Sequence, residues 1–325
     1  MTGRLAPRGK FLASVGIGHA GGWQAWAADL ESAGPRRWLQ VALGWVWIVD
    51  AALQYQPYMF TRSFVTQIID PVSAGNPAVI SNAVLGSGEI ILSHPVIFNA
   101  AFATIQLVIG MGLLRRRTSR AALAATIAWA LGVWWLAEGL GGILTGSASP
   151  VTGAPGAALM YVVIAVLAWP RKSGAKSATG PRRSAAGATG AGSTGADDTG
   201  AGSIAAGSRI GMRGAQLIWV SLWVSSACFV VQAPNRAAGA LRDTVAGLAS
   251  GEPGWIAAMD RGAASAIGSS RTALLMTLAI VFLIIAAGVL VPTAIRPALI
   301  LAVFTAVLIW AVGENFGGIL TGQGT

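Results

Sequence analysis

The chain has 325 residues, of which 54% are hydrophobic and 10% charged, and its formal net charge is +10 at pH 7. Soluble domains carry about 25% charged residues, so this composition excludes an ordinary soluble domain and predicts an integral membrane protein in a lipid bilayer. The basic residues cluster beside apolar runs without the pattern of a nucleic-acid-binding module, and the single cysteine, Cys228, excludes an internal disulfide.

Residues 1–36 mix basic residues with glycine, alanine and tryptophan, and their most apolar stretch is too interrupted for a signal peptide. We expect a cytoplasmic tail here, followed by a first membrane unit at residues 37–170. A bilayer core requires ~20 apolar residues per helix. The predicted spans of this unit are residues 38–56, 95–114, 121–139 and 157–169.

A long, proline-punctuated loop separates the first two spans, and within it residues 64–69 and 78–92 predict short helices along the outer surface. The basic run RRRTSR at residues 115–120 closes the second span. A turn-rich stretch, SASPVTGAPG at residues 147–156, precedes the fourth.

Residues 171–211 consist of small residues with arginine and lysine and predict a flexible basic linker on the cytoplasmic side. A second membrane unit follows at residues 212–325. Its predicted spans are residues 216–232, 272–290 and 297–313. No fourth span follows, so either the eighth helix is lost or the chain is a truncated form of a longer one. Truncation is favoured, because a seventh span leaves the second bundle without a partner surface that the first one has.

The strongest sequence feature is a repeated glycine motif, EGLGGILTG at residues 138–146 and ENFGGILTG at residues 314–322, with seven of nine positions identical. The same offset (314 − 138 = 176) aligns Arg37 with Arg213 and Trp134 with Trp310 without a gap. Such self-similarity predicts an internal duplication. The expected fold is therefore an all-α integral membrane protein of two tandem four-helix repeats, the second lacking its last helix in this chain.

Basic segments decide the predicted orientation, because arginine and lysine accumulate on the cytoplasmic side. The tail, the 115–120 run and the linker all fall on one side of the predicted spans. Both long loops and both glycine motifs then lie outside the cell. The excess of arginine over lysine, with abundant alanine and glycine, indicates a bacterial protein of the inner membrane.

Charged side chains inside a bilayer cost at least ~2.5 kcal/mol each, so they are candidate functional groups. Asp50 lies in the outer half of the first span and is either a proton, cation or head-group ligand or an acid bonded to a neighbouring helix. Glu138 and Glu314 each follow a tryptophan by four residues, so indole and carboxyl share one helix face. They either cap a helix end at the interface or line an outer cavity shared by both motifs.

The candidate residues of that outer cavity are Asp50, Gln54, Trp134, Glu138, Gly141, Gly142, Trp310, Glu314, Gly317 and Gly318. Catalytic residues are not assigned, and no metal site is expected. His19 and His94 lie outside the predicted spans, which excludes a haem with two axial histidines inside the bilayer.

With the spans placed, the first half resembles the DoxX/DoxD-like family of four-helix bacterial membrane proteins. The resemblance covers about 130 residues and lies in the opening span RWLQVALGWVWIVDAALQ and in the hairpin IQLVIGMGLLRRRTSRAALAATIAWAL. It implies an accessory or quinone-facing subunit of a membrane redox system, with a quinone as ligand and no prosthetic group of its own. A membrane or extracytoplasmic protein partner is also implied.

Two alternatives remain open at this point. The first is a transporter of a small solute or ion with its path between the repeats, which requires a continuous polar cavity joining Asp50 to the two glutamates. The second is a structural membrane scaffold that binds an extracytoplasmic partner.

Overall fold

The computed structural model describes residues 34–170, 211–249 and 252–317, without the side chains of residues 269–271. Most of the predicted tail, most of the predicted linker and Gly318 lie outside these ranges, and residues 35–36 of the predicted tail belong to α2. Every regular element within them is helical. The α-helices are α2 (Pro35–Gln54), α3 (Arg62–Phe64), α4 (Ala78–Ser93), α5 (Pro95–Leu114), α6 (Ser119–Leu136), α7 (Ala157–Leu167), α8 (Met212–Val230), α9 (Ala240–Leu248), α10 (Gly254–Gly288) and α11 (Ile295–Val312). The shorter helical segments are η1 (Pro57–Phe60), η2 (Val65–Ile69), η3 (Asp70–Ser73), η4 (Gly139–Thr145), η5 (Pro150–Thr152), η6 (Pro234–Arg236) and η7 (Pro292–Ala294).

Within the described part, 3 segments are long and apolar enough to cross a membrane, namely α5, α6 and the stretch Pro292–Val312 that contains α11. A fourth is added if the two arms of α10 count as one bent span. The helices α2 and α8 coincide with predicted spans but fall outside this set, and α2 carries two arginines and Asp50. The 11 residues of α7 are too few to cross a bilayer unaided. The chain is therefore an all-helical protein whose apolar helices suit a lipid bilayer.

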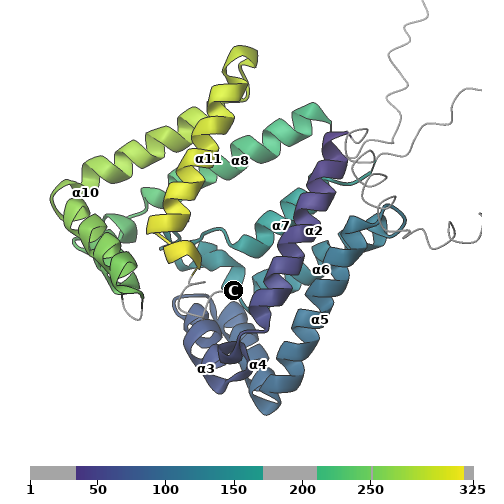
Figure 1. Ribbon diagram of the computed structural model, residues 1–325. Coiled ribbons are helices and arrows are strands. Elements are labelled where there is room, and N and C mark those ends of the chain that lie inside the picture. The colour runs from purple at the N-terminus through teal and green to yellow at the C-terminus, as the bar shows by residue number, and fades with distance from the viewer. Residues whose placement is uncertain (1–33, 171–210, 250–251, 318–325) are drawn as a thin grey trace, which may run out of the picture.

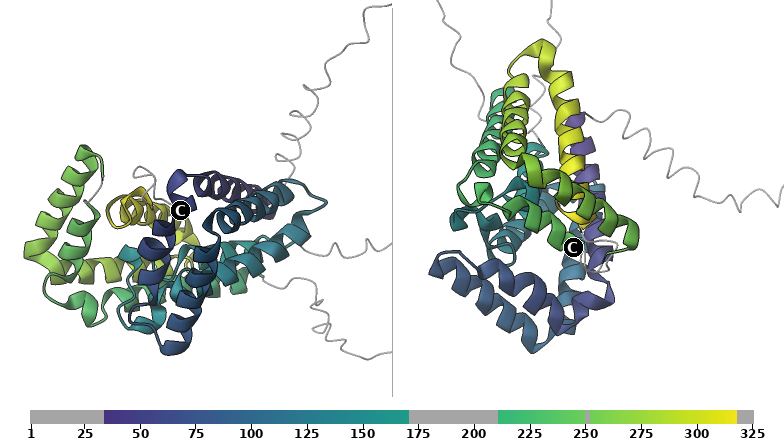
Figure 2. Two further views of the ribbon diagram at one scale, coloured as in Figure 1. Left: turned by 90° about the horizontal axis from the view of Figure 1, so that it is seen from below. Right: turned by 90° about the vertical axis from the view of Figure 1, so that its left-hand side faces the viewer.

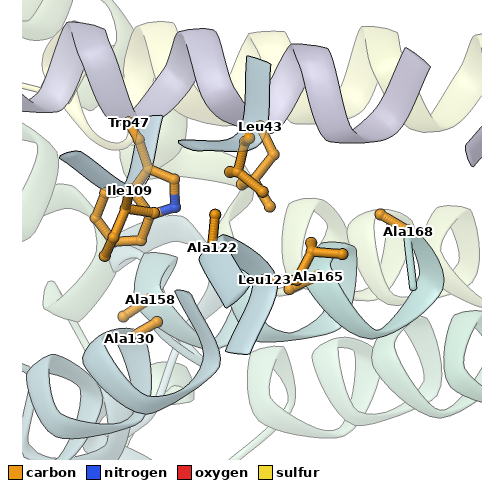
Figure 3. Close-up of a cluster of buried hydrophobic side chains, with 10 residues drawn as sticks. Leu43, Trp47, Ile109, Ala122, Leu123, Ala130, Ala158, Ala165 and Ala168 are labelled. Carbon is orange, nitrogen blue, oxygen red and sulfur yellow. The ribbon is translucent and has the colours of Figure 1, made fainter. Parts of the chain in front are cut away.

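The first half packs α2 on α5 and α6 on α7 (Figure 1). Gly44 of α2 faces Gly110 of α5, where a Cβ on Gly44 would lie 3.0 Å from the carbonyl oxygen of Gly110. Small residues of this kind let membrane helices approach closely. Leu43 and Trp47 point from α2 toward the alanine-rich faces of α6 and α7, where Leu123 is fully buried (Figure 3).

Two side chains of α2 satisfy backbone carbonyls at the ends of neighbouring helices. Arg37 is buried and donates to the carbonyl oxygen of Leu113 (2.8 Å), in the last turn of α5. Gln40 donates to the carbonyl oxygen of Ala168 (2.9 Å), directly after α7. The last carbonyls of a helix have no partner within the helix, so these bonds tie α5 and α7 to α2.

The segment from η1 to α4 forms a separate layer across one end of the first half, with α3 and α4 seen side-on in Figure 2. Met59, Val65 and Val84 form its fully buried core. In the second half, α8, α9 and α11 all pack on α10. Val151 of η5 joins the core of this second half, which connects the two halves of the chain.

The bounds of several elements coincide under the 176-residue offset. Shifting α6 by this offset gives the bounds of α11, and shifting α2 gives those of α8 to within one residue. The same offset places the junction of α4 and α5, at His94, on the bend of α10. There the two arms of α10, Gly254–Gly268 and Thr272–Gly288, meet at 101°. In these elements the local structure follows the repeated sequence.

Candidate functional site

The first glycine motif turns the chain sharply at the end of α6. The amide of Glu138 donates to the carbonyl of Val133 (3.0 Å), and the amide of Gly141 donates to the carbonyl of Glu138 (2.7 Å). Gly139 to Gly142 all have positive φ, and this run includes Leu140 at φ 58°. A leucine in the left-handed region is strained by roughly 1 to 2 kcal/mol, so the turn is held by its surroundings.

The second motif makes the same turn at the end of α11. The amide of Glu314 donates to the carbonyl of Ile309 (3.2 Å), and the amide of Gly317 donates to the carbonyl of Glu314 (2.8 Å). Asn315, Phe316 and Gly317 have φ of 52°, 55° and 67°. The left-handed turn therefore forms even where Asn and Phe replace the Gly and Leu of the first motif.

Side chains of the first motif are held by the segment that enters α7. The indole Nε1 of Trp134 donates to the carbonyl oxygen of Pro155 (2.7 Å), and the amide of Ala158 donates to Oε1 of Glu138 (3.1 Å). A carboxylate at a helix N-terminus satisfies an unpaired amide and opposes the helix dipole. Gly156, at φ +105°, is required here because a Cβ would overlap the carboxylate of Glu138.

A cavity of about 1230 Å³ lies between the two motifs. Its wall is mostly apolar and comes from the η2–η3 region, α4, α5, α6, η4, η5, the start of α7, α8, α10 and α11. The aromatic side chains on it are Phe64, Phe98, Phe102, Trp129, Trp223, Phe282 and Trp310. Part of the rim is apolar, since Ile90, Leu136 and Trp310 are 60%, 37% and 41% exposed, and the exposed residues Ser147 and Thr152 are polar wall residues elsewhere.

The structure brings most of the predicted outer-cavity residues to this wall. Those on the wall are Gln54, Glu138, Gly141, Gly142, Trp310, Glu314 and Gly317. Trp134 is not on the wall, because its indole packs against the segment that enters α7. Gly318 lies outside the described residues.

Asp50 also lies away from the cavity wall. Its Oδ2 accepts a hydrogen bond from the hydroxyl of Tyr161 (2.8 Å), which joins α2 to α7. The rings of Trp47 and Tyr161 form a T-shaped contact, with their centroids 4.9 Å apart. The geometry corresponds to the reading of Asp50 as an acid bonded to a neighbouring helix. Its counterpart under the offset, Ser226, is on the wall.

Burial shifts the pKa of both glutamates. It raises the pKa of Glu314 above its usual range, and it raises the pKa of Glu138, where the bond from the amide of Ala158 opposes the shift. In the part of the chain that the structure describes, no side chain or amide bonds to the carboxylate of Glu314. Of these two carboxyl groups, only that of Glu138 therefore has a hydrogen-bond donor among the described residues.

Several wall residues were not predicted from the sequence. Trp129, Trp223 and Gln106 each have a buried polar atom with no partner among the described residues. Buried polar atoms are normally paired, so unmet hydrogen-bonding capacity lies beside the cavity. Of these three, only Trp223 carries a sequence signal, because the 176-residue offset aligns it with Trp47, which is itself a core residue.

His94 is exposed at the junction of α4 and α5. Among the described residues no group of three or more histidine, cysteine or acidic side chains is arranged to hold a metal ion.

Comparison with protein-family models, with curated protein sequences and with solved structures finds no significant match to this chain. The chemistry of the cavity is therefore argued from its own residues.

Proposed function

We propose that this chain is a polytopic bacterial inner-membrane protein that binds a quinone-class ligand between its two glycine motifs. In this proposal it is an accessory, quinone-facing subunit of a membrane redox system and carries no prosthetic group of its own. The observation that supports this proposal is the large, mostly apolar and aromatic cavity, which has a few polar groups at the motifs. Sites for apolar ligands combine such walls with a small number of polar groups that orient the ligand.

The proposal includes an architecture of two tandem four-helix units with the same orientation in the membrane. The basic segments then face the cytoplasm, and both motifs face outward. The coincident bounds of α6 and α11 and the shared left-handed turns support this arrangement. The loose resemblance to DoxX/DoxD-like proteins supports the redox context.

The transporter alternative receives less support from the geometry. It requires a polar path that joins Asp50 to Glu138 and Glu314, whereas Asp50 is bonded to Tyr161 and lies off the wall. An apolar wall favours an amphipathic molecule over a hydrated solute. The scaffold alternative makes no use of the cavity.

Filling the cavity tests the proposal. Gly132 lies on the wall, four residues before the end of α6 at Leu136, and nothing within 4 Å would meet a Cβ there. Gly132→Phe should therefore place a ring in the cavity without disturbing the helix. We expect the affinity for a short-chain quinone, measured by titration of the purified protein in lipid nanodiscs, to fall by about tenfold or more, or ~1.4 kcal/mol.

Gly86→Phe is the matched control, because Gly86 is also helical with open space around it but lies in α4, off the wall. The Gly86→Phe variant should bind the short-chain quinone with the same affinity as the unmodified protein. Equal binding by Gly132→Phe and the unmodified protein, or no binding of quinone by either, would refute the proposed function.

A further inference from the structure

The layer formed by α9 and the first arm of α10 contains a buried acid at a place where the first half has an apolar residue. Asp260 of α10 is fully buried, and neither of its carboxylate oxygens has a hydrogen-bond partner in the described part of the chain. Its counterpart under the 176-residue offset is Val84, in the apolar core of the layer from η1 to α4. A buried carboxyl group without a partner is costly, so Asp260 requires a ligand or a proton.

A second acid lies beside Asp260. Glu252 precedes Pro253, the N-cap of α10, and its Oε2 is buried without a partner among the described residues. Burial and the charge of Asp260 together raise the pKa of Glu252. Two carboxylates at close range repel each other, so the pair favours a positive charge beside it. No described basic side chain bonds to these buried oxygens.

Asn315 of the second motif supplies a further buried oxygen. Its Nδ2 donates to the carbonyl oxygen of Leu248 (3.2 Å), at the end of α9. In the first half, Nδ2 of Asn76 donates to the carbonyl oxygen of Val72 (2.9 Å), which is the counterpart of Leu248. The amide of Asn315 therefore takes the bond that the amide of Asn76 makes. Its Oδ1 is buried and has no partner among the described residues.

The first half also shows where a side chain at this motif position points. A Cβ on Gly139, the counterpart of Asn315, would lie 2.9 Å from Nδ2 of Asn76. Glu252 is the counterpart of Asn76, so the side chain of Asn315 points toward Glu252. The neighbouring ring of Phe316 packs on that of Trp255, with their centroids 6.3 Å apart, and this contact holds the turn against the start of α10.

We propose that Asp260, Glu252 and Oδ1 of Asn315 bind a hard divalent cation, Ca²⁺, between the second motif and the start of α10. Ca²⁺ takes about six to eight oxygen ligands from carboxylates, amides, backbone carbonyls and water. The three side chains offer oxygen ligands only, without the histidine or cysteine that transition metals favour. A bound cation would offset the burial of both acids. The inference is independent of the ligand in the cavity.

The test titrates CaCl₂ by calorimetry into the full chain, after a chelator has stripped the protein and has been removed. Nanodiscs of zwitterionic lipid keep Ca²⁺ from binding to anionic head groups. We expect one site with a dissociation constant of roughly 10⁻⁴ to 10⁻³ M, as in extracellular Ca²⁺ modules. Asp260→Val, which introduces the residue of the first half, should weaken binding by at least about tenfold. Asp243→Asn removes the same charge at an exposed position of α9 and should keep the affinity.

Two further measurements separate cation binding from folding. In chelator, Asp260→Val should unfold at the same temperature as the unmodified protein or at a higher one, because it removes an unpaired buried acid. Glu252→Asn, again the residue of the first half, should also weaken Ca²⁺ binding by at least about tenfold, and it decides the question if Asp260→Val does not fold. Failure of the unmodified protein to bind Ca²⁺, or unchanged affinity in a folded variant of either acid, would overturn the inference. Neither outcome affects the quinone titration, which tests the proposed function separately.

Discussion

Glu138 and Glu314 occupy the same position in their motifs and differ in what surrounds them. The amide of Ala158 occupies the first carboxylate, whereas the second meets the cavity without a described donor. Among the described residues, only Glu138 therefore ties its motif to the start of a following helix. The sequence left open whether the two glutamates cap helix ends or line a shared cavity, and the contact of Glu138 with the start of α7 depends on packing that no local pattern reports.

Gly141 shows how closely the turn approaches its neighbour. A Cβ at Gly141 would overlap the carbonyl group of Pro155, whereas a Cβ at Gly142 would meet nothing closer than 3.9 Å. Both glycines have positive φ, 62° and 68°. Gly141→Ala should lower the free energy of unfolding by about 2 to 4 kcal/mol, from backbone strain and overlap together.

Gly142→Ala controls for backbone strain alone and should cost about 1 kcal/mol. Unfolding in mixed micelles with increasing denaturant would measure both variants. Equal losses for the two glycines would contradict a close approach at Gly141.

Among the elements, α2 and α8 have matching bounds but bind different neighbours. Gln40 of α2 donates to the residue that follows α7, whereas Gln216 of α8 donates to Val289 at the end of α10 (3.0 Å). The face of α6 that α7 covers includes Leu123, which is fully buried, while Leu299 at the equivalent place on α11 is 42% exposed. In the described part, no helix covers that face of α11.

Arg37 and Arg213 provide a matched pair for testing this difference. Arg37 is buried and donates to carbonyls at the end of α5, and Arg213 is exposed. Arg37→Met should lower the free energy of unfolding by about 1 to 3 kcal/mol, because it leaves buried carbonyls unpaired. Arg213→Met should change it by less than about 0.5 kcal/mol. Thermal unfolding in one detergent would compare them, and equal effects would refute the role given to Arg37.

Element positions were largely predictable from the sequence, and element lengths were less so. Hydrophobic runs and prolines located α5, α6 and α11 to within a few residues. The predicted span at residues 157–169 is a helix of only 11 residues, which begins at Ala157 as predicted and ends two residues early at Leu167. The predicted span at residues 272–290 is one arm of the longer α10, since no proline interrupts that helix as Pro95 separates α4 from α5.

At the scale of the whole molecule, the two halves meet where η5 packs on α8 and α11. Asn235 donates to the carbonyl of Ala148 (2.8 Å), and a Cβ at Gly313 would overlap the carbonyl of Val151. The sequence predicted SASPVTGAPG only as a turn-rich connection. Its packing into the other half arises from long-range contacts, which residue patterns do not encode.

Gly313→Val should wedge the halves apart at this contact. We expect the free energy of unfolding to fall by about 1 to 3 kcal/mol and the quinone affinity to fall with it, because both halves supply the cavity wall. Gly262→Val is the control, since Gly262 is helical with open space around it and off the wall. Loss of stability without any loss of affinity would show that the cavity does not depend on this contact.

The apolar part of the rim, formed by Ile90, Leu136 and Trp310, has a consequence for how the cavity fills. Inside a bilayer, a mouth with such a border exchanges molecules sideways with the acyl chains, and a long isoprenoid tail need never cross water. Occupancy would then be governed by the mole fraction of ligand among the lipids. Added detergent would empty the cavity by dilution, whereas added buffer would leave it filled.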